Sequence, residues 1–121
     1  MYNYFLTFGR IQNDPTLIDL PDGKKVVNML IGVQRSFKNS DGNYDYDTLK
    51  VSFWDFLADY ANNTFKKGRY IGLKGRIAPQ EVEIEGGKKA IYHNLVCERV
   101  FFYEYGEAKE FPIFASTEEE S

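Results

Sequence analysis

The sequence predicts an all-β domain with one helix, in which five strands close into a small barrel. Five segments are rich in β-branched and aromatic residues, and residues typical of turns lie between several of them. One further segment changes to the apolar spacing of a helix. The chain has 121 residues, a length typical of a single domain.

The strands are predicted from these segments and from the turn signals Asp22-Gly23, Asp41-Gly42 and Gly86-Gly87. The five strands are expected at residues 2–11, 25–37, 44–54, 70–77 and 90–103. Within 70–77, alternation predicts that Ile71, Leu73 and Ile77 face one side of the sheet and that Tyr70, Lys74 and Arg76 face the other.

The helix is predicted at residues 55–65, between the third and fourth strands. Asp55 is expected to cap its start, and Gly68 is expected to end it in a left-handed conformation. Apolar residues recur there at helical spacing: Leu57, Ala58, Ala61 and Phe65. Three strands, a helix and two strands is the element order of an oligonucleotide/oligosaccharide-binding barrel (OB-fold), although other small β-rich barrels share it.

The composition excludes several classes of protein. Hydrophobic residues make up 43% and charged residues 27%, so the chain can form a packed core. No apolar run approaches the ~20 residues of a membrane helix, and the sequence shows no secretion signal pattern. One cysteine (Cys97) and one histidine (His93) cannot complete a disulfide framework or a zinc site. Without a catalytic motif or a phosphate-binding glycine loop, we expect a cytoplasmic binding protein with no enzymatic activity, metal or cofactor.

Charge is distributed unevenly along the chain. The whole sequence carries −3, but residues 104–121 contain six Glu and one Lys, which leaves 14 basic and 12 acidic residues in 1–103. A mildly basic body followed by an acidic tail is typical of proteins that interact with nucleic acids. We expect a folded domain over residues 1–105 and an acidic, disordered tail over residues 106–121.

The predicted strand 44–54 has a polar and aromatic face opposite its core face. Leu49, Val51 and Phe53 are expected to face the core. The opposite face then carries Tyr46, Thr48, Lys50, Ser52 and Trp54. Aromatic planes stack on unpaired bases at ~1–3 kcal/mol each, and cations neutralise phosphates. This face therefore predicts binding of single-stranded nucleic acid; the alternative is that Trp54 and Tyr46 cover a neighbouring strand or a second subunit.

A second ring flanked by cations lies at a predicted hairpin tip, where Phe37 stands between Arg35 and Lys38. By itself this pattern also fits an ordinary solvated hairpin end. Together with Trp54 on the paired strand, it strengthens the prediction of a nucleic-acid surface.

Three motifs give the sequence a resemblance to a known family. They lie at residues 9–17 (GRIQNDPTL), 35–39 (RSFKN) and 66–77 (KKGRYIGLKGRI), and they resemble bacterial and phage single-stranded DNA-binding proteins. The resemblance covers residues 1–103. It implies an OB-fold domain that assembles as a homotetramer and coats single-stranded DNA without sequence preference, in replication, recombination and repair, with no enzymatic activity and no cofactor.

The resemblance also implies which side chains bind DNA. Phe37 and Trp54 stand where the family has base-stacking aromatics, whereas Thr48 and Val82 stand where better-studied members have two more Trp residues. Strand phase suggests two candidate replacements, Tyr46 and Tyr92. The candidate phosphate contacts are Arg10, Arg35, Lys38, Lys50, Lys74 and Arg76.

Two segments depart from the family pattern. Residues 78–85 are expected to form a loop with three Glu that suits phosphate poorly, so we expect a shorter footprint and weaker, more salt-sensitive binding. The tail carries an apolar motif in an internal position, a candidate docking site for replication and recombination proteins: Phe111, Pro112, Ile113 and Phe114. A merely solubilising acidic end is the alternative.

Two other functions fit the same fold. One is a replication accessory or loader whose aromatic face binds protein, which the lost Trp positions and the acidic loop favour. The other is binding of oligosaccharide or structured RNA, which leaves the cations around Phe37 without an explanation.

Overall fold

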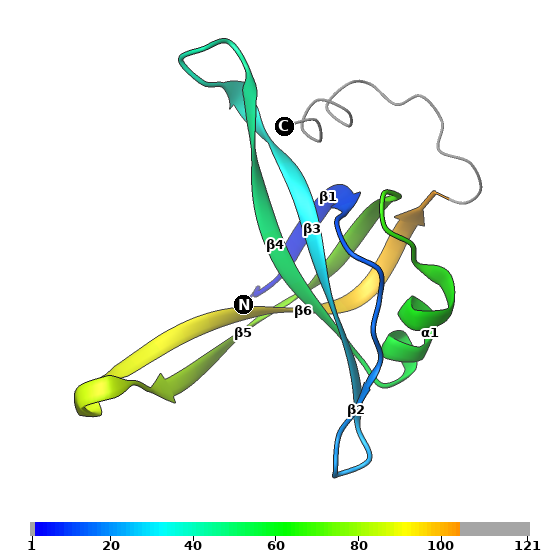
Figure 1. Ribbon diagram of the computed structural model, residues 1–121, viewed down its shortest axis with the longest axis vertical. Coiled ribbons are helices and arrows are strands. Elements are labelled where there is room, and N and C mark those ends of the chain that lie inside the picture. The colour runs from blue at the N-terminus through cyan, green and yellow to red at the C-terminus, as the bar shows by residue number, and fades with distance from the viewer. Residues whose placement is uncertain (1, 105–121) are drawn as a thin grey trace.

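Five long strands form one closed barrel in the computed structural model, which describes residues 2–104 (Figure 1). The barrel strands are β1 (Phe5–Ile11), β3 (Lys25–Lys38), β4 (Tyr44–Trp54), β5 (Tyr70–Glu83) and β6 (Lys89–Tyr103). They follow one another around the barrel in the order β1-β5-β6-β4-β3. Pairing of Arg10 and Ile11 in β1 with Gly32 and Ile31 in β3 closes the sheet. The predicted OB-fold, with three strands, a helix and two strands, is confirmed.

One additional strand lies outside the barrel. β2 (Ile18–Asp19) pairs with Val26 and Lys25 at the edge of β3. The sequence does not predict this strand, because two residues are too few to show an alternating pattern.

The core lies inside the barrel and under the helix α1 (Phe56–Thr64). β4 contributes Val51 and Phe53, as the alternation predicts, and α1 contributes Ala58 and Ala61. Phe65, directly after α1, packs edge-on against Phe53 with ring centroids 5.5 Å apart. The small alanines let α1 lie close to the barrel.

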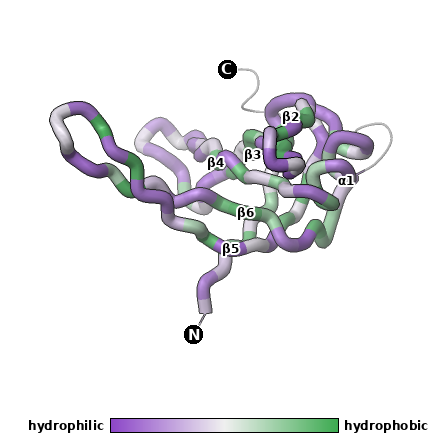
Figure 2. The backbone as a smooth tube through the Cα atoms, turned by 90° about the horizontal axis from the view of Figure 1, so that it is seen from below, coloured by the Kyte–Doolittle hydropathy of each residue, from purple (hydrophilic) through white to green (hydrophobic). Residues whose placement is uncertain are grey.

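Two long hairpins extend from the barrel as arms, one formed by β3 and β4 and the other by β5 and β6. Figure 1 shows them diverging, and Figure 2 shows the β5–β6 arm leaving the barrel on the side away from α1. The prediction of a loop at residues 78–85 is wrong, because β5 continues to Glu83 and only a short turn, η1 (Glu85–Gly87), joins it to β6. Pro79 and the acidic residues of this segment hide its strand character in the sequence, yet an exposed hairpin arm tolerates them.

The predicted cap at Asp55 is also wrong. Asp55 makes no side-chain capping bond to α1; its Oδ1 accepts the backbone N–H of Lys25 at 3.1 Å instead. Gly68 has the expected positive φ, 91°, but it lies in the turn after Phe65, whose extended backbone ends the helix.

Tyr70 lies on the side of β5 opposite Ile71 and Leu73, as the alternation predicts, but this side is covered rather than open. Its ring is buried on the outside of the barrel, where it stacks on Phe8 of β1 with ring centroids 6.1 Å apart. The ring of Phe102 also packs against Phe8, with ring centroids 5.5 Å apart. Strand alternation assigned the side of the sheet, but it could not show that other aromatic residues cover that side.

Candidate nucleic-acid interface

One continuous sheet face runs across β3, β4 and β6 on the outside of the barrel. Ser52 of β4 pairs with Asn28 of β3 and with Val96 of β6, and paired residues point to the same side of a sheet. The Ser52 hydroxyl donates to Asn28 Oδ1 at 2.8 Å. This outer face includes Val26, Asn28, Leu30, Tyr46, Thr48, Lys50, Ser52, Trp54, Tyr92, Asn94 and Val96.

The outer face is hollowed where the β5–β6 arm diverges from β4. The resulting open groove has a volume of about 580 Å³. Its lining includes polar side chains of β4 and of the arm: Thr48, Lys50, Ser52, Gln80, His93 and Asn94. Asn94 Nδ2 donates to Gln80 Oε1 at 2.9 Å, which orients both amides along the groove. Hydroxyl, amide and ammonium groups beside the ring of Tyr92 suit a ligand that has both flat apolar and polar parts.

The four candidate stacking rings do not form one cluster. Trp54 is 37% exposed at the α1 end of β4, Phe37 is 64% exposed near the tip of the β3–β4 arm, and Tyr92 is 53% exposed on the β5–β6 arm. Tyr46 is half-buried, and its hydroxyl donates to Gln34 Oε1 at 3.2 Å. Trp54 and Tyr46 share a face eight residues apart, which corresponds to ~26 Å along a strand. A ligand that touches all four rings must therefore be an extended chain.

The two positions without the expected Trp residues both line the groove. Thr48 lies on β4 and Val82 on the β5–β6 arm. Val82 pairs with Ala90, so Tyr92, two residues further along β6, is its diagonal neighbour on the same face. This placement is consistent with the hypothesis that Tyr92 supplies the ring that Val82 lacks.

The six candidate phosphate contacts fall into two groups. Lys50 lines the groove and has no ion-pair partner within residues 2–104. Lys38 and Lys74 stand over the rings of Tyr44 and Tyr4, at 5.9 and 5.1 Å, so neither charge is neutralised there. Of these three, Lys74 lies away from the groove, across from Leu6 of β1.

The three arginines make contacts within the protein. Arg10 donates from Nε to the carbonyl of Gly68 at 3.0 Å and lies over the ring of Tyr70. Arg76 lies 3.7 Å from Glu98. Sequence reasoning could not separate these arginines from the lysines, because the difference depends on which acids and carbonyls the fold brings near.

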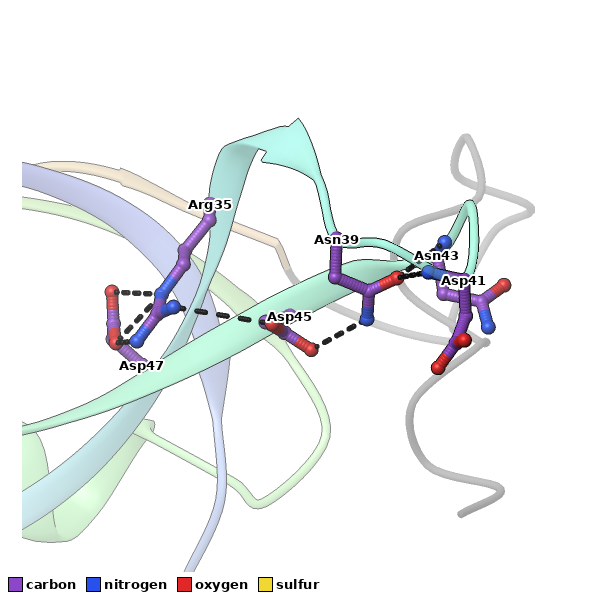
Figure 3. A network of polar contacts seen from close by, with 6 residues as sticks. All are labelled: Arg35, Asn39, Asp41, Asn43, Asp45 and Asp47. Carbon is purple, nitrogen blue, oxygen red and sulfur yellow. Dashed lines mark hydrogen bonds and ion pairs between the residues drawn. The ribbon is translucent and has the colours of Figure 1, made fainter.

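Arg35 is the most strongly engaged of the three (Figure 3). Its Nε and Nη2 donate to Asp47 at 3.1 and 2.9 Å, and its Nη1 lies 3.9 Å from Asp45. The hydrogen bond from Arg35 is the main cause that lowers the pKa of Asp47. The same bond, joined by the charge of Asp47, raises the pKa of Arg35.

The same network fixes the tip of the β3–β4 arm. Asn39 Nδ2 donates to Asp45 Oδ1 at 3.0 Å, and Asn39 Oδ1 accepts the backbone N–H groups of Asp41 and Asn43 (Figure 3). The side chain of Asn39 thereby holds the turn together. The arm that carries Phe37 is thus braced by polar contacts rather than by a core.

The structure adds candidate residues that the sequence does not predict. Gln80, His93 and Asn94 line the groove, and Phe56, the first residue of α1, is 79% exposed next to Trp54. Phe56 carries a sequence signal in retrospect, since it lies off the apolar stripe of the helix. Gln80 and Asn94 carry no such sequence signal, because their place in the groove depends on how far β5 extends.

Within residues 2–104, no group of three or more His, Cys, Asp or Glu side chains is placed to hold a metal ion. No helix of that region is long and apolar enough to cross a membrane.

OB-fold domains bind oligonucleotides or oligosaccharides on the face of their second and third barrel strands and on the adjoining loops. In this chain those strands are β3 and β4, and they carry the outer face. The chain belongs to the single-strand binding protein family, whose family model matches residues 2–103.

Curated relatives align over most of the chain. It is 35% identical over 104 residues to the single-stranded DNA-binding protein of Oceanobacillus iheyensis, covering 86% of this chain and 65% of that protein. It is 34% identical to single-stranded DNA-binding protein 2 of Listeria innocua, with the same coverage. It is 29% identical over 110 residues to single-stranded DNA-binding protein 1 of Staphylococcus aureus, covering 91% of this chain and 66% of that protein. The matched region thus spans just under two thirds of these relatives.

Proposed function

We propose that this protein binds single-stranded DNA without sequence preference, by stacking unpaired bases on exposed rings and neutralising phosphates with lysines. The observation that carries the proposal is the outer face itself, where Trp54 is exposed and Lys50, which has no ion-pair partner among residues 2–104, lines a groove with Tyr92. Bases of any sequence have a flat face, so stacking is tolerant of sequence. The family membership and the names of the relatives support the same ligand.

The proposed role is to protect single-stranded DNA during replication, recombination and repair in the cytoplasm, without a catalytic step or a cofactor. Membership of a single-strand binding family supports a binding role. The arrangement of rings on two arms supports an extended ligand rather than a small substrate.

Titration with poly-dT tests this function directly. Trp54 is the single tryptophan of the chain, so stacking of a base on it should quench the fluorescence of the protein. Trp54→Ala should weaken binding by ~1–3 kcal/mol, measured by the anisotropy of a labelled oligo-dT, and should leave the fold intact because the indole is partly exposed. Unchanged affinity of this variant would remove stacking on Trp54 from the mechanism.

The alternative function is a replication accessory whose aromatic face binds protein. The acidic residues Glu81 and Glu83 of the β5–β6 arm, and the absence of rings at Thr48 and Val82, favour it. Poly-dT would then leave the fluorescence of Trp54 unchanged.

Assembly into a homotetramer, or another homo-oligomer, is part of the proposal. The outside of β1 supports it, because Leu6 and Phe8 are exposed there beside Tyr4 and make an apolar surface. Light scattering measures the mass of the assembly, and a monomeric mass would contradict this part of the proposal.

Two further expectations concern the end of the chain. The tail over residues 106–121 and its candidate docking motif lie outside the described residues. Docking of replication or recombination proteins on Phe111, Pro112, Ile113 and Phe114 stays a prediction, as does the domain boundary after residue 105.

A further inference from the structure

Phe56 is an exposed aromatic residue whose position the fold of the barrel does not explain. It opens α1, is 79% exposed, and stands apart from the helix residues that are buried, Ala58 and Ala61. Within residues 2–104, neither Phe56 nor the nearby Trp54 contacts another aromatic ring. A single exposed ring is common on protein surfaces, so the argument for binding rests on where this ring stands.

The residue between the two rings has a strained backbone. Asp55 has φ 50° and ψ −113°, and it is the one residue other than glycine with a positive φ in the described part of the chain. Such conformations are costly for residues with a Cβ, and they persist where the surrounding structure enforces them. They concentrate at functional sites, so this corner is a candidate site on grounds independent of the exposure of Phe56.

The corner is held from β3 and from α1. Asp55 donates its N–H to the carbonyl of Lys25 at 2.9 Å and accepts the Lys25 N–H on Oδ1 at 3.1 Å. Its own carbonyl accepts the N–H groups of Ala58 and Asp59 at 2.9 and 3.1 Å. These four bonds fix the backbone between Trp54 and Phe56, so the two rings are attached to a rigid support.

The spacing of the two residues suits consecutive nucleotides. Residues two apart have Cα atoms at most ~7 Å from each other. Neighbouring nucleotides of one strand are ~3.4 Å apart when stacked, and they separate further when the strand is stretched. The backbone positions of Trp54 and Phe56 are thus spaced as successive bases of a stretched strand are.

The charges at the corner do not oppose this path strongly. Asp59 pairs with the Lys25 ammonium at 3.3 Å, and the Asp55 carboxylate is turned to the Lys25 backbone. Both acids near Phe56 are thus engaged with one lysine residue. The corner also continues directly from the outer face, which ends at Trp54.

We propose that Phe56 is an additional base-stacking platform, which carries single-stranded DNA from Trp54 around the Asp55 corner onto the start of α1. The inference rests on the proposed single-stranded DNA binding and adds a contact to it. A base is the proposed occupant, rather than a protein side chain, because the ring continues a face already assigned to stacking.

The test compares three substitutions of Phe56 in the full chain, with oligo-dT as the ligand. Phe56→Ala and Phe56→Leu should each weaken binding ~5- to 150-fold, because both remove the aromatic plane. Phe56→Tyr should retain the affinity of the wild type. Since Trp54 remains in all three variants, its fluorescence quenching reports binding, and light scattering and a thermal melt report assembly and folding.

Phe101→Ala is the matched control. Phe101 is an exposed aromatic residue of β6 that belongs neither to the outer face nor to the groove, so its removal should not change affinity. Wild-type affinity of Phe56→Ala, or tight binding by Phe56→Leu, would overturn the inference, as would a changed mass of the Phe56→Ala assembly. If Trp54→Ala weakens binding while Phe56→Ala does not, only this extension fails; if the wild type does not bind oligo-dT, the proposed function fails.

Discussion

Arg35 shows that a residue predicted to bind phosphate can already be bound to an acidic side chain of the protein. Its guanidinium is bound by Asp47 through two donors, so phosphate binding would have to displace a carboxylate. Both side chains are about half exposed, and pairs of this kind contribute little net stability in water. Asp47 therefore competes with phosphate for Arg35 and makes this arginine less available to DNA.

Asp47→Asn should tighten binding to oligo-dT, because it removes the closest carboxylate from Arg35 and leaves only the longer contact with Asp45 at 3.9 Å. One added phosphate contact steepens the slope of log affinity against log salt by ~0.7, so the gain in affinity over the wild type should be about fivefold larger at 0.1 M than at 1 M salt. Asp41→Asn removes an equal charge from the same arm without freeing an arginine, so it serves as the control for net charge. Equal affinities of the two variants would show that Arg35 does not reach phosphate.

The pH dependence of the pair has a definite sign. Because the folded pKa of Asp47 is lowered, mainly by the hydrogen bond from Arg35, the pairing is complete above the ordinary pKa of an aspartate. The pairing is lost as the pH falls through the lowered pKa of Asp47, because the carboxylate is then protonated. At neutral pH the carboxylate is charged, so the competition with phosphate operates under physiological conditions.

At the scale of elements, the corner at Asp55 decides how β4 passes into α1. The sequence pattern predicted an ordinary helix cap, because Asp precedes a helical run. The side chain instead bonds to Lys25 across the sheet, and the backbone takes a positive φ. The same carboxylate can cap the helix or bond to a neighbouring strand, and the residues around Asp55 do not show which of the two it does.

Substitutions of Asp55 should separate its hydrogen bond from its backbone strain. Asp55→Ala loses the bond to Lys25 and keeps the positive φ, so its free energy of unfolding should fall by about 1 kcal/mol. Asp55→Gly loses the same bond but relieves the strain, so it should be about 1 kcal/mol more stable than Asp55→Ala. Urea unfolding measures both, and the reverse order would show that the corner is unstrained.

In the β5–β6 arm, the sequence predicts the turn but not the strands that lead to it. Its hairpin turn was evident from Gly86 and Gly87, both of which have positive φ in the structure. The strands leading to that turn were not evident, because Pro79 and three Glu read as a loop. An arm exposed on both faces needs no apolar alternation, so it lacks the pattern from which strands are predicted.

At the scale of the whole molecule, the net charge says little about DNA binding, because local pairing decides which cations are available. Of the six candidate phosphate contacts, the three arginines are engaged within the protein. At most Lys38, Lys50 and Lys74 remain free of acidic partners within residues 2–104. The affinity for DNA should therefore depend more on stacking than the number of basic residues suggests.

The salt dependence of binding tests this division. Three phosphate contacts predict a slope of log affinity against log salt of about −2 per chain, whereas six predict about −4. Titration with oligo-dT over a tenfold range of NaCl concentration measures the slope. Lys50→Ala should reduce its magnitude by ~0.7, and Arg10→Ala should leave it unchanged. A wild-type slope near −4 would show that the arginines exchange their protein partners for phosphate.

The sequence by itself determined the barrel, the position of the helix and the two faces of β4, since these follow from periodic patterns of apolar residues. Only the tertiary structure decided which cations are free, how far the arms extend, and that Phe56 and Trp54 flank one rigid corner. Periodicity is a property of neighbouring residues. Charge pairing, arm length and the placement of the corner depend on contacts between residues far apart in the chain, such as Lys25 with Asp55.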